Sequence, residues 1–222
     1  RRRLEELGIA GRSKKIIKLF HAVDSRRFLG NDADAAEWKQ RLGLEGRRVV
    51  TCVALMDGPR KGHATLLHAF RIVRNSFPDA ALLLVGDGSN LENLKRWSAE
   101  LGLGDSVVFA GRLHPQDVQH TMKLADVTVL PTHVEVFGNV VFESLLLGVP
   151  VVSGNVGAAA DVLAEHGFGL LFEPGHVGQL ADAILRVMRS SDDFRERARQ
   201  GGEFVSKQMA IEARVEGFLR SE

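Results

Sequence analysis

The sequence lacks the features that mark several classes of protein. Its 222 residues include a single cysteine, Cys52, so the chain has no disulfide framework and no cysteine-based metal site. A reducing compartment, the cytoplasm, is the simplest setting for such a chain. The formal net charge is only +1, which argues against a strong overall attraction to nucleic acid or to a membrane surface.

Long apolar runs and metal-ligand spacings are also missing. No run of about 18 apolar residues occurs, so the sequence predicts no bilayer-spanning helix. The eight histidines form no H-x-x-x-H pair. The H-x-E within "THVE" lacks the P-C-x-x-C partner that a zinc deaminase needs. The "DAD" at 32–34 fits the opening of a helix, where acidic residues interact favourably with the helix dipole. We therefore expect no metal site.

What the chain does contain is an alternation of short β-rich runs with amphipathic helical patterns. The β-rich runs are nearly all apolar, as expected for a parallel sheet that is covered by helices on both faces. About six strands interleaved with helices predict an α/β fold, a doubly wound, Rossmann-like parallel sheet. The predicted strands are 48–55, 80–86, 106–111, 126–131, 149–154 and 169–172.

End signals and apolar spacing predict the helices between these strands. Ser89 and Glu92 match an S-x-x-E capping box, and Pro115 suits the first turn of the next helix. A largely polar helix is predicted over 192–219. Two further helices are predicted from apolar faces, one with Leu66, Leu67, Phe70 and Val73 and one with Leu180, Ile184, Val187 and Met188.

The predicted topology concentrates ligand-binding groups at one edge of the sheet. Right-handed crossovers place the C-terminal ends of all parallel strands together, and ligands bind in the crevice there. The stretch "VGDGSN" at 85–90 lies at this edge, where glycines let the backbone approach a phosphate. It resembles a dinucleotide fingerprint only in part, because Leu91 occupies the third glycine position, and a plain tight turn also accounts for it.

The stretch "PTHVEVFGNVVFESLLLGVP" at 131–150 carries the stronger signal. It predicts a loop after a strand and then a helix that starts near Gly138. The N–H groups of Gly138, Asn139 and Val140 are then available to an anion. Glu135 precedes this helix, and Glu143 lies about one turn into it.

Two carboxylates beside an anion site suggest a sugar–phosphate ligand. Carboxylates do not bind phosphate, but they accept hydrogen bonds from sugar hydroxyls. The alternative is that Glu135 and Glu143 are surface acids stabilised by the helix N-terminus.

Taken together, these stretches resemble the C-terminal half of a GT-B glycosyltransferase of the retaining group 1 (family 4) type. The resemblance covers nearly the whole chain and rests on the joint order of several weak motifs. Glu135 and Glu143 match the family's E-x7-E, with "FG" between them and "LLLGVPVV" after them. The other matching segments, in order, are "HAVDSRRF", "GPRKGHATLLHAF", "LLLVGDG", "VVFAGRL", "LADVTVLP" and "GLLFEPG".

The resemblance implies metal-independent transfer of a sugar, with retention, from a nucleotide-diphosphate sugar to a hydroxyl acceptor, with no further cofactor. Lys61 matches the family's phosphate lysine. Glu135 matches the acid at the donor sugar, so the resemblance assigns both residues to catalysis. Glu143 matches the acid that binds ribose. The remaining implied donor-binding residues are Gly86, Gly111, Arg112, Phe137, Gly138, Asn139 and Val140.

The chain also departs from the family pattern. The family's G-R-L before K-G reads Ala54, Leu55 and Met56, so the arginine that contacts the diphosphate is absent, and Arg60 is its candidate substitute. The later G-G-x-x-E reads Gly157, then three alanines, then Asp161, and His21 stands where the family has asparagine. Losing one diphosphate cation costs on the order of 2–4 kcal/mol of transition-state stabilisation, by analogy with one oxyanion donor.

The resemblance implies the following organisation. Residues 1–28 are predicted to be a lead-in or interdomain connector, and 29–222 the nucleotide-sugar-binding domain. The implied partners are the donor, a missing N-terminal acceptor-binding domain and a glycan or glycolipid acceptor, with peripheral membrane association through the missing part and no nucleic acid. Two alternatives stay open: a catalytically silent binding subunit, and another GT-B or Rossmann enzyme, such as a nucleotide-sugar epimerase or a dinucleotide-dependent oxidoreductase.

Overall fold

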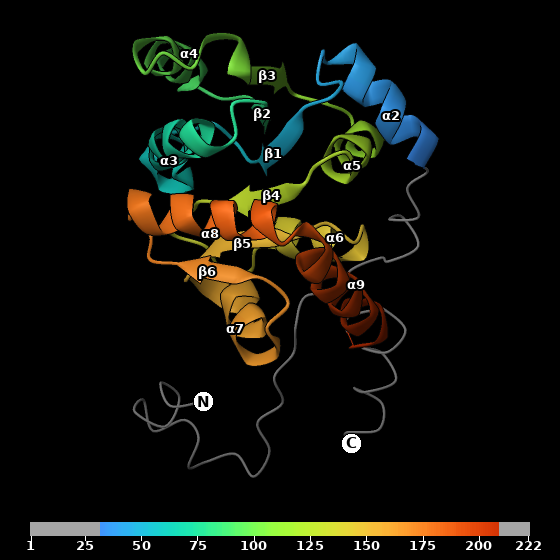
Figure 1. Ribbon diagram of the computed structural model, residues 1–222. Coiled ribbons are helices and arrows are strands. Elements are labelled where there is room, and N and C mark those ends of the chain that lie inside the picture. Colours follow the sequence, from blue (N-terminus) through green and yellow to red (C-terminus); the bar gives the residue numbers. More distant parts are fainter. Residues whose placement is uncertain (1–31, 209–222) are drawn as a thin grey trace, which may run out of the picture.

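The structure is a computed structural model that describes residues 32–208 of the chain. The connector predicted for 1–28 lies outside the described residues, as does the end of the helix predicted over 192–219. The described part forms one six-stranded, all-parallel sheet with helices on both faces (Figure 1). The predicted fold class is therefore confirmed.

The sheet has the strand order β3-β2-β1-β4-β5-β6. The chain builds outward from β1 in one direction, then returns to the centre and builds outward in the other. This reversal places a switch point between β1 and β4, where the loops after the two strands diverge to opposite faces. The strands are β1 (Arg48–Val53), β2 (Ala80–Val85), β3 (Val107–Gly111), β4 (Val127–Leu130), β5 (Val151–Gly154) and β6 (Leu170–Phe172).

The helices form two layers around the sheet (Figure 1). Helices α3, α4 and α8 cover one face, whereas α2, α5 and α6 cover the other, and α9 packs on α6. The helices are α2 (Asp32–Arg41), α3 (His63–Ser76), α4 (Leu91–Glu100), α5 (Pro115–Lys123), α6 (Asn139–Leu146), α7 (Gly157–His166), α8 (Val177–Arg189) and α9 (Ser191–Gln208), with short 3-10 helices η2 (Pro59–Lys61) and η3 (Gly104–Ser106).

The apolar strands are explained by burial on both faces. In β1, Val50 and Cys52 belong to the core beneath α3 and α8, whereas Val49 belongs to the core beneath α2 and α5. All six residues of β2 are buried. Cys52 is fully buried, and burial raises the pKa of its thiol to about 12. The four apolar positions predicted for one face of α3 and the four predicted for α8 are all buried.

The element ends differ from the sequence predictions in small but informative ways. The strands are shorter than predicted by one or two residues. The predicted capping box at Ser89 and Glu92 is wrong, because the N-cap residue of α4 is Asn90. The side chain of Asn90 makes no capping hydrogen bond. The backbone N–H and the hydroxyl of Ser89 instead donate to Asp57 Oδ1, at 2.9 and 3.2 Å. Ser89 therefore donates to Asp57, in the β1–α3 loop, instead of forming the predicted capping box within its own helix.

Two adjacent glycines let α9 approach α6 closely. A Cβ at Gly202 would lie 2.4 Å from the carbonyl oxygen of Leu145, and one at Gly201 would lie 2.9 Å from the Leu145 side chain.

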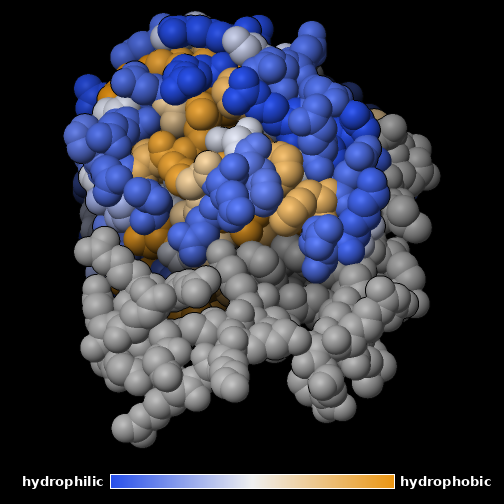
Figure 2. Space-filling model, turned by 90° about the horizontal axis from the view of Figure 1, so that it is seen from below, coloured by the Kyte–Doolittle hydropathy of each residue, from blue (hydrophilic) through white to orange (hydrophobic). Residues whose placement is uncertain are grey.

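Figure 2 views the molecule from the side of α7 and shows hydrophilic residues around smaller apolar patches on the described part of that face. Within residues 32–208, no helix is both long and apolar enough to cross a bilayer.

Candidate donor-binding site

The β1–α3 loop places two basic residues at the switch point. Arg60 and Lys61 lie in η2, directly before Gly62, the N-cap residue of α3. Gly62 has a φ of 71°, and a Cβ there would lie 1.8 Å from the carbonyl oxygen of Pro131. Only glycine fits this position, because both the backbone conformation and the contact with the β4–α6 loop exclude a side chain.

Backbone and side-chain hydrogen bonds join the two loops on either side of the switch point. The N–H of His133 donates to the carbonyl oxygen of Arg60 at 2.8 Å, and the Thr132 hydroxyl contacts the same oxygen at 3.2 Å. Lys61 Nζ donates to Glu135 Oε2 at 3.0 Å, and the two side chains are 26% and 18% exposed. The structure thus brings together the two residues that the sequence assigned to catalysis.

The Glu135 carboxylate is held in its ionised form. Burial raises its pKa, but the hydrogen bond and charge of Lys61, together with the N–H groups of Val136 and Phe137, outweigh burial and lower the pKa overall. The Val136 N–H donates to Glu135 Oε1 at 3.1 Å. Glu135 is therefore an acceptor-only group beside Lys61.

Helix α6 begins beside this pair, as predicted. Its N-cap residue Gly138 has a φ of 83°, and no side chain caps the helix among the described residues. A Cβ at Gly138 would lie 2.9 Å from the Ala159 Cβ, so a larger residue would push the helix start away from α7. The Phe137 and Phe142 rings, 5.1 Å apart, anchor the first turn. The N-terminus of α6 is a suitable place for an anion.

Glu143 lies on the first turn and a half of α6 and is more enclosed than a surface acid. Burial raises the pKa of its carboxyl group. The two glutamates therefore differ in electrostatic environment, since Lys61 balances Glu135 whereas burial disfavours the charge of Glu143. Such a difference is typical of a binding site rather than of two solvated helix acids.

The start of α7 supports the Glu135 loop from behind. The N–H groups of Ala158 and Ala159 donate to the carbonyl oxygens of Val136 and Phe137, each at 3.0 Å. A Cβ at Gly157 would lie 2.7 Å from the carbonyl oxygen of Glu135. The first N–H groups of α7 are thus used for positioning the loop, and Asp161 is exposed on the same helix.

A cavity of about 440 Å³ lies at the ends of β1, β2 and β3. Among its lining residues are Gly86 and Arg112, which the sequence assigned to the donor site. Gly111 lies at its margin, where its carbonyl oxygen accepts the Gly86 N–H at 2.8 Å. Sequence reasoning missed the lining residues Asp57, Asp87, Leu113 and Val118. Asp57, Asp87 and Leu113 lie shortly after apolar strands, which is a weak signal, whereas Val118 lies in α5.

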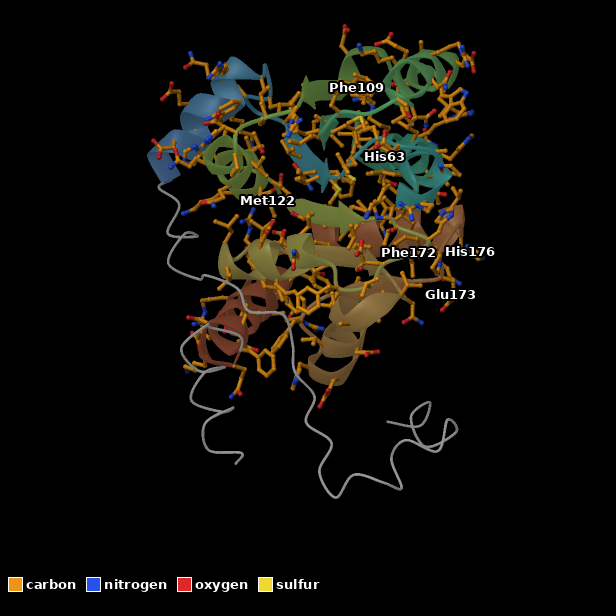
Figure 3. All side chains as sticks on the ribbon, turned by 180° about the vertical axis from the view of Figure 1, so that it is seen from behind. His63, Phe109, Met122, Phe172, Glu173 and His176 are labelled. Atoms are coloured by element: carbon orange, nitrogen blue, oxygen red, sulfur yellow. The ribbon has the colours of Figure 1, made fainter. Side chains whose placement is uncertain are left out.

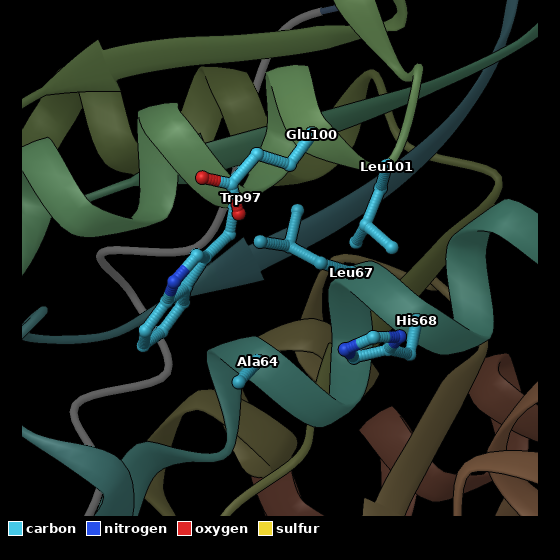
Figure 4. A pocket seen from close by; sticks show the side chains of 6 residues that line it. All are labelled: Ala64, Leu67, His68, Trp97, Glu100 and Leu101. Carbon is cyan, nitrogen blue, oxygen red and sulfur yellow. The ribbon is translucent and has the colours of Figure 1, made fainter.

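A second hollow of about 240 Å³ lies between α3 and α4 (Figure 4). It is lined by Leu67, His68, Trp97 and Glu100, among others, and contains none of the predicted site residues. Its carboxylate, Glu100, is paired with Arg96 at 3.7 Å. The edge of the sheet where the strands end, with Lys61, the N-terminus of α6 and the two glutamates, is therefore the candidate functional site.

The fold is that of a Rossmann-like, GT-B-type domain. The family model of glycosyl transferases group 1 matches residues 34–203, and the chain belongs to this family. The chain is 32% identical over 210 residues to a GDP-mannose-dependent alpha-(1-6)-phosphatidylinositol monomannoside mannosyltransferase of Mycobacterium tuberculosis, covering 90% of this chain and 54% of that protein. It thus spans about half the length of the curated relatives that it matches.

Solved structures agree on the fold. The C-terminal domain of a group 1 family protein (LpcC) from Francisella tularensis superposes with a TM-score of 0.72 at 18% identity, over 85% of this chain and 99% of that one. Anabaena HepE, crystallised in complex with UDP, superposes with a TM-score of 0.85 at 24% identity, over 97% of this chain and 59% of that one. The predicted recognition as a C-terminal-type GT-B domain is therefore confirmed.

Proposed function

We propose that the chain is the donor-binding half of a retaining glycosyltransferase that moves a sugar from a nucleotide-diphosphate sugar to a hydroxyl acceptor without a metal ion. The observation that carries this proposal is the half-buried Lys61–Glu135 pair beside the uncapped start of α6. A cation and a helix N-terminus suit a diphosphate, and the adjacent carboxylate suits a sugar hydroxyl.

The proposed chemistry uses these groups as the glycosidic bond breaks. Negative charge then grows on the leaving diphosphate, and Lys61 with the N–H groups at 138–140 stabilises it, with Arg60 as the second cation. Glu135 accepts a hydroxyl of the donor sugar, and Glu143 accepts the ribose hydroxyls. Because Lys61 lowers the pKa of Glu135, this carboxylate is a poor proton acceptor. The leaving diphosphate is therefore proposed to take the proton of the incoming hydroxyl, on the same face of the sugar, which gives retention.

The rest of the parent protein is part of the proposal. Since the chain spans 54% of its mannosyltransferase relative, a further domain is proposed to bind the acceptor and to complete the crevice. The name of this phosphatidylinositol monomannoside mannosyltransferase suggests a glycan or glycolipid acceptor. We propose that the acceptor is reached at the cytoplasmic face of a membrane.

Binding by the chain itself tests the proposal. Calorimetric titration with UDP, GDP, ADP and NAD should show that one diphosphate binds and that NAD does not. Lys61→Ala should weaken this binding by roughly 10- to 100-fold, because it removes a charge-assisted hydrogen bond. Glu143→Ala should weaken it as well.

Lys95→Ala is the matched control, since Lys95 pairs with Glu92 on the exposed face of α4. Binding that survives Lys61→Ala unchanged, or a preference for NAD, would contradict the proposal. With the parent protein, NMR of the product should show the same anomeric configuration as the donor, which tests retention. The reaction should proceed equally well with a chelator present, which tests independence of a metal ion.

A silent binding subunit is the second candidate, and one observation favours it. Leu55, which occupies the family's arginine position, is 63% exposed at the crevice. Diphosphate binding by this chain without any transfer by the parent protein would support that alternative.

A further inference from the structure

The hollow of about 240 Å³ between α3 and α4 is separate from the cavity at the strand ends, since the two share no lining residue. We propose that this hollow is a second carbohydrate site, which holds one pyranose unit of a glycan outside the donor-binding crevice. The second site is independent of the donor site, because none of the residues assigned to the donor lines the hollow.

Both helices contribute apolar and aromatic walls to the hollow. Leu67 of α3 is fully buried, and in Figure 4 it lies between the Trp97 ring of α4 and the His68 ring of α3. Trp97 and Leu101 also pack against the hydrophobic core, which holds the indole ring in place. A wall that is ordered before the ligand arrives reduces the entropy cost of binding.

Polar groups around the hollow are available to a ligand. Within residues 32–208, neither the Trp97 indole N–H nor the His68 imidazole has a hydrogen-bond partner. Glu100 has only its ion pair with Arg96, at 3.7 Å, and both of these side chains are 62% exposed. Because so exposed an ion pair contributes little, a ligand hydroxyl can replace it at the carboxylate. The hollow therefore offers a donor, an acceptor and an imidazole that does either.

This combination fits a ring that is apolar on one face and carries hydroxyls at its edge. The C–H groups on one face of a pyranose carry a small positive charge and can lie against the negative face of the Trp97 indole. Pyranose hydroxyls both donate and accept, so they can satisfy the indole N–H, the imidazole and the carboxylate together. The hollow is smaller than the about 300–1,000 Å³ of pockets for drug-sized ligands, so a single ring suits it better than an extended ligand.

Two other classes of ligand fit less well. An apolar side chain of a partner protein would cover the Trp97 N–H and the His68 ring without pairing them, and a polar group buried without a partner is costly. A cationic ligand on the indole face is disfavoured because Arg96 already balances the charge of Glu100. A sugar avoids both costs.

The two tryptophans of the chain give the test an internal control. Trp38, in α2, is 9% exposed and packs beneath Arg41, so its indole N–H should not respond to a ligand between α3 and α4. In NMR titrations of the isotope-labelled protein with methyl mannopyranoside and methyl glucopyranoside, at least one sugar should shift the Trp97 indole signal saturably. The dissociation constant should be on the order of millimolar.

Two simpler alcohols separate the features of the ligand. Sorbitol carries similar hydroxyls on an open chain, and cyclohexanol is a ring with one hydroxyl. Both should bind roughly tenfold or more weakly than the pyranoside, because each lacks either the flat face or the polar edge.

Variants connect binding to the named residues. Glu100→Ala should weaken sugar binding roughly tenfold, because it removes a charged acceptor from an exposed position. Glu92→Ala is the matched control, since Glu92 is an exposed acid of α4 that pairs with Lys95 outside the hollow. Trp97→Phe keeps an aromatic ring but removes the N–H. It identifies the Trp97 signal by its loss, and saturation-transfer NMR on the sugar should show weaker binding.

A Trp97 signal that stays fixed up to about 100 mM sugar, or that sorbitol shifts equally, would overturn the carbohydrate assignment. Tighter binding of cyclohexanol than of either sugar would reveal an apolar groove and overturn it as well. Sugar binding that is lost in Lys61→Ala, or displaced by a nucleoside diphosphate, would belong to the donor crevice and not to a second site. Sugar binding that Lys61→Ala retains supports the second site, whatever this variant does to diphosphate binding.

Discussion

Two ionisable residues at the start of α3 are held in contrasting ways. Lys61 is paired with Glu135 at 3.0 Å. His63 lies two residues further on, between α3 and the sheet, and is only 2% exposed (Figure 3). Neither of its ring nitrogens has a hydrogen-bond partner among the described residues. Burial lowers the pKa of His63 to about 4, and the charge of Lys61 acts in the same direction. His63 is therefore neutral in the folded protein.

The depressed pKa of His63 predicts a loss of stability in mild acid. Its ordinary pKa is 6.5, so between this value and about 4 the unfolded chain binds a proton that the folded protein does not. The free energy of unfolding should therefore fall as the pH drops through this window, with a contribution from His63 of about 3 kcal/mol near the lower end. Urea unfolding of the protein and of His63→Leu at several pH values measures this contribution.

Other groups define the controls for that experiment. Glu135 has a lowered pKa, so its contribution is lost only as the pH falls below the ordinary value of 4.5. Glu143 has a raised pKa, so its stabilising contribution is lost as the pH rises above 4.5. His68→Leu, at an exposed position of α3, is the matched control variant. If His63→Leu kept the full slope between pH 6.5 and 4.5, the assignment would be wrong.

At the scale of elements, the turn into α3 depends on close contact between two loops. We predict that Gly62→Ala costs more than 3 kcal/mol of unfolding free energy, because it combines positive-φ strain of about 1–2 kcal/mol with a backbone clash. Gly43→Ala is the matched control, since Gly43 has a similar φ of 65° but open space around its Cβ position. Chemical denaturation should show that Gly43→Ala lowers the free energy of unfolding only by the cost of the positive-φ strain. Equal costs for the two variants would mean that the contact with Pro131 does not matter.

The sequence predicted elements well where the signal was local or periodic. Apolar runs marked β1 to β6, and four buried positions marked the inner face of α3, because burial on one face leaves a period in the sequence. The capping box failed because Asp57, more than 30 residues from Ser89, competes for the same groups. The sequence could not predict the Lys61–Glu135 hydrogen bond or the lining of the cavity, because both depend on which loops the strand order brings together.

At the scale of the whole molecule, the last described helix is coupled to the candidate site through α6. Gly202 lets α9 rest against the backbone of α6 at Leu145, and the opposite end of α6 is the proposed anion site. Gly202→Ala should therefore lower both stability and diphosphate affinity, because the Cβ would force α9 and α6 apart. Thermal unfolding and calorimetric titration of the variant measure these two effects.

A glycine in another helix provides the contrast. The nearest atoms to a Cβ at Gly178, near the start of α8, would lie 3.7 Å away or more, in ordinary contact. Gly178→Ala should therefore stabilise the protein by up to about 1 kcal/mol and leave ligand affinity unchanged. A Gly202→Ala variant as stable as the unmodified chain would show that the close approach of α6 and α9 can relax at no cost.

The burial of Cys52 makes the protein a convenient object for spectroscopy. Its thiol has no exposed surface and a pKa that burial raises to about 12, so it should not react with thiol-directed dyes in the folded state. The Val136 side chain, by contrast, is 84% exposed beside Glu135. A fluorophore attached through Val136→Cys would therefore be the single label on the molecule, and it would report the filling of the crevice in real time without removal of the native cysteine.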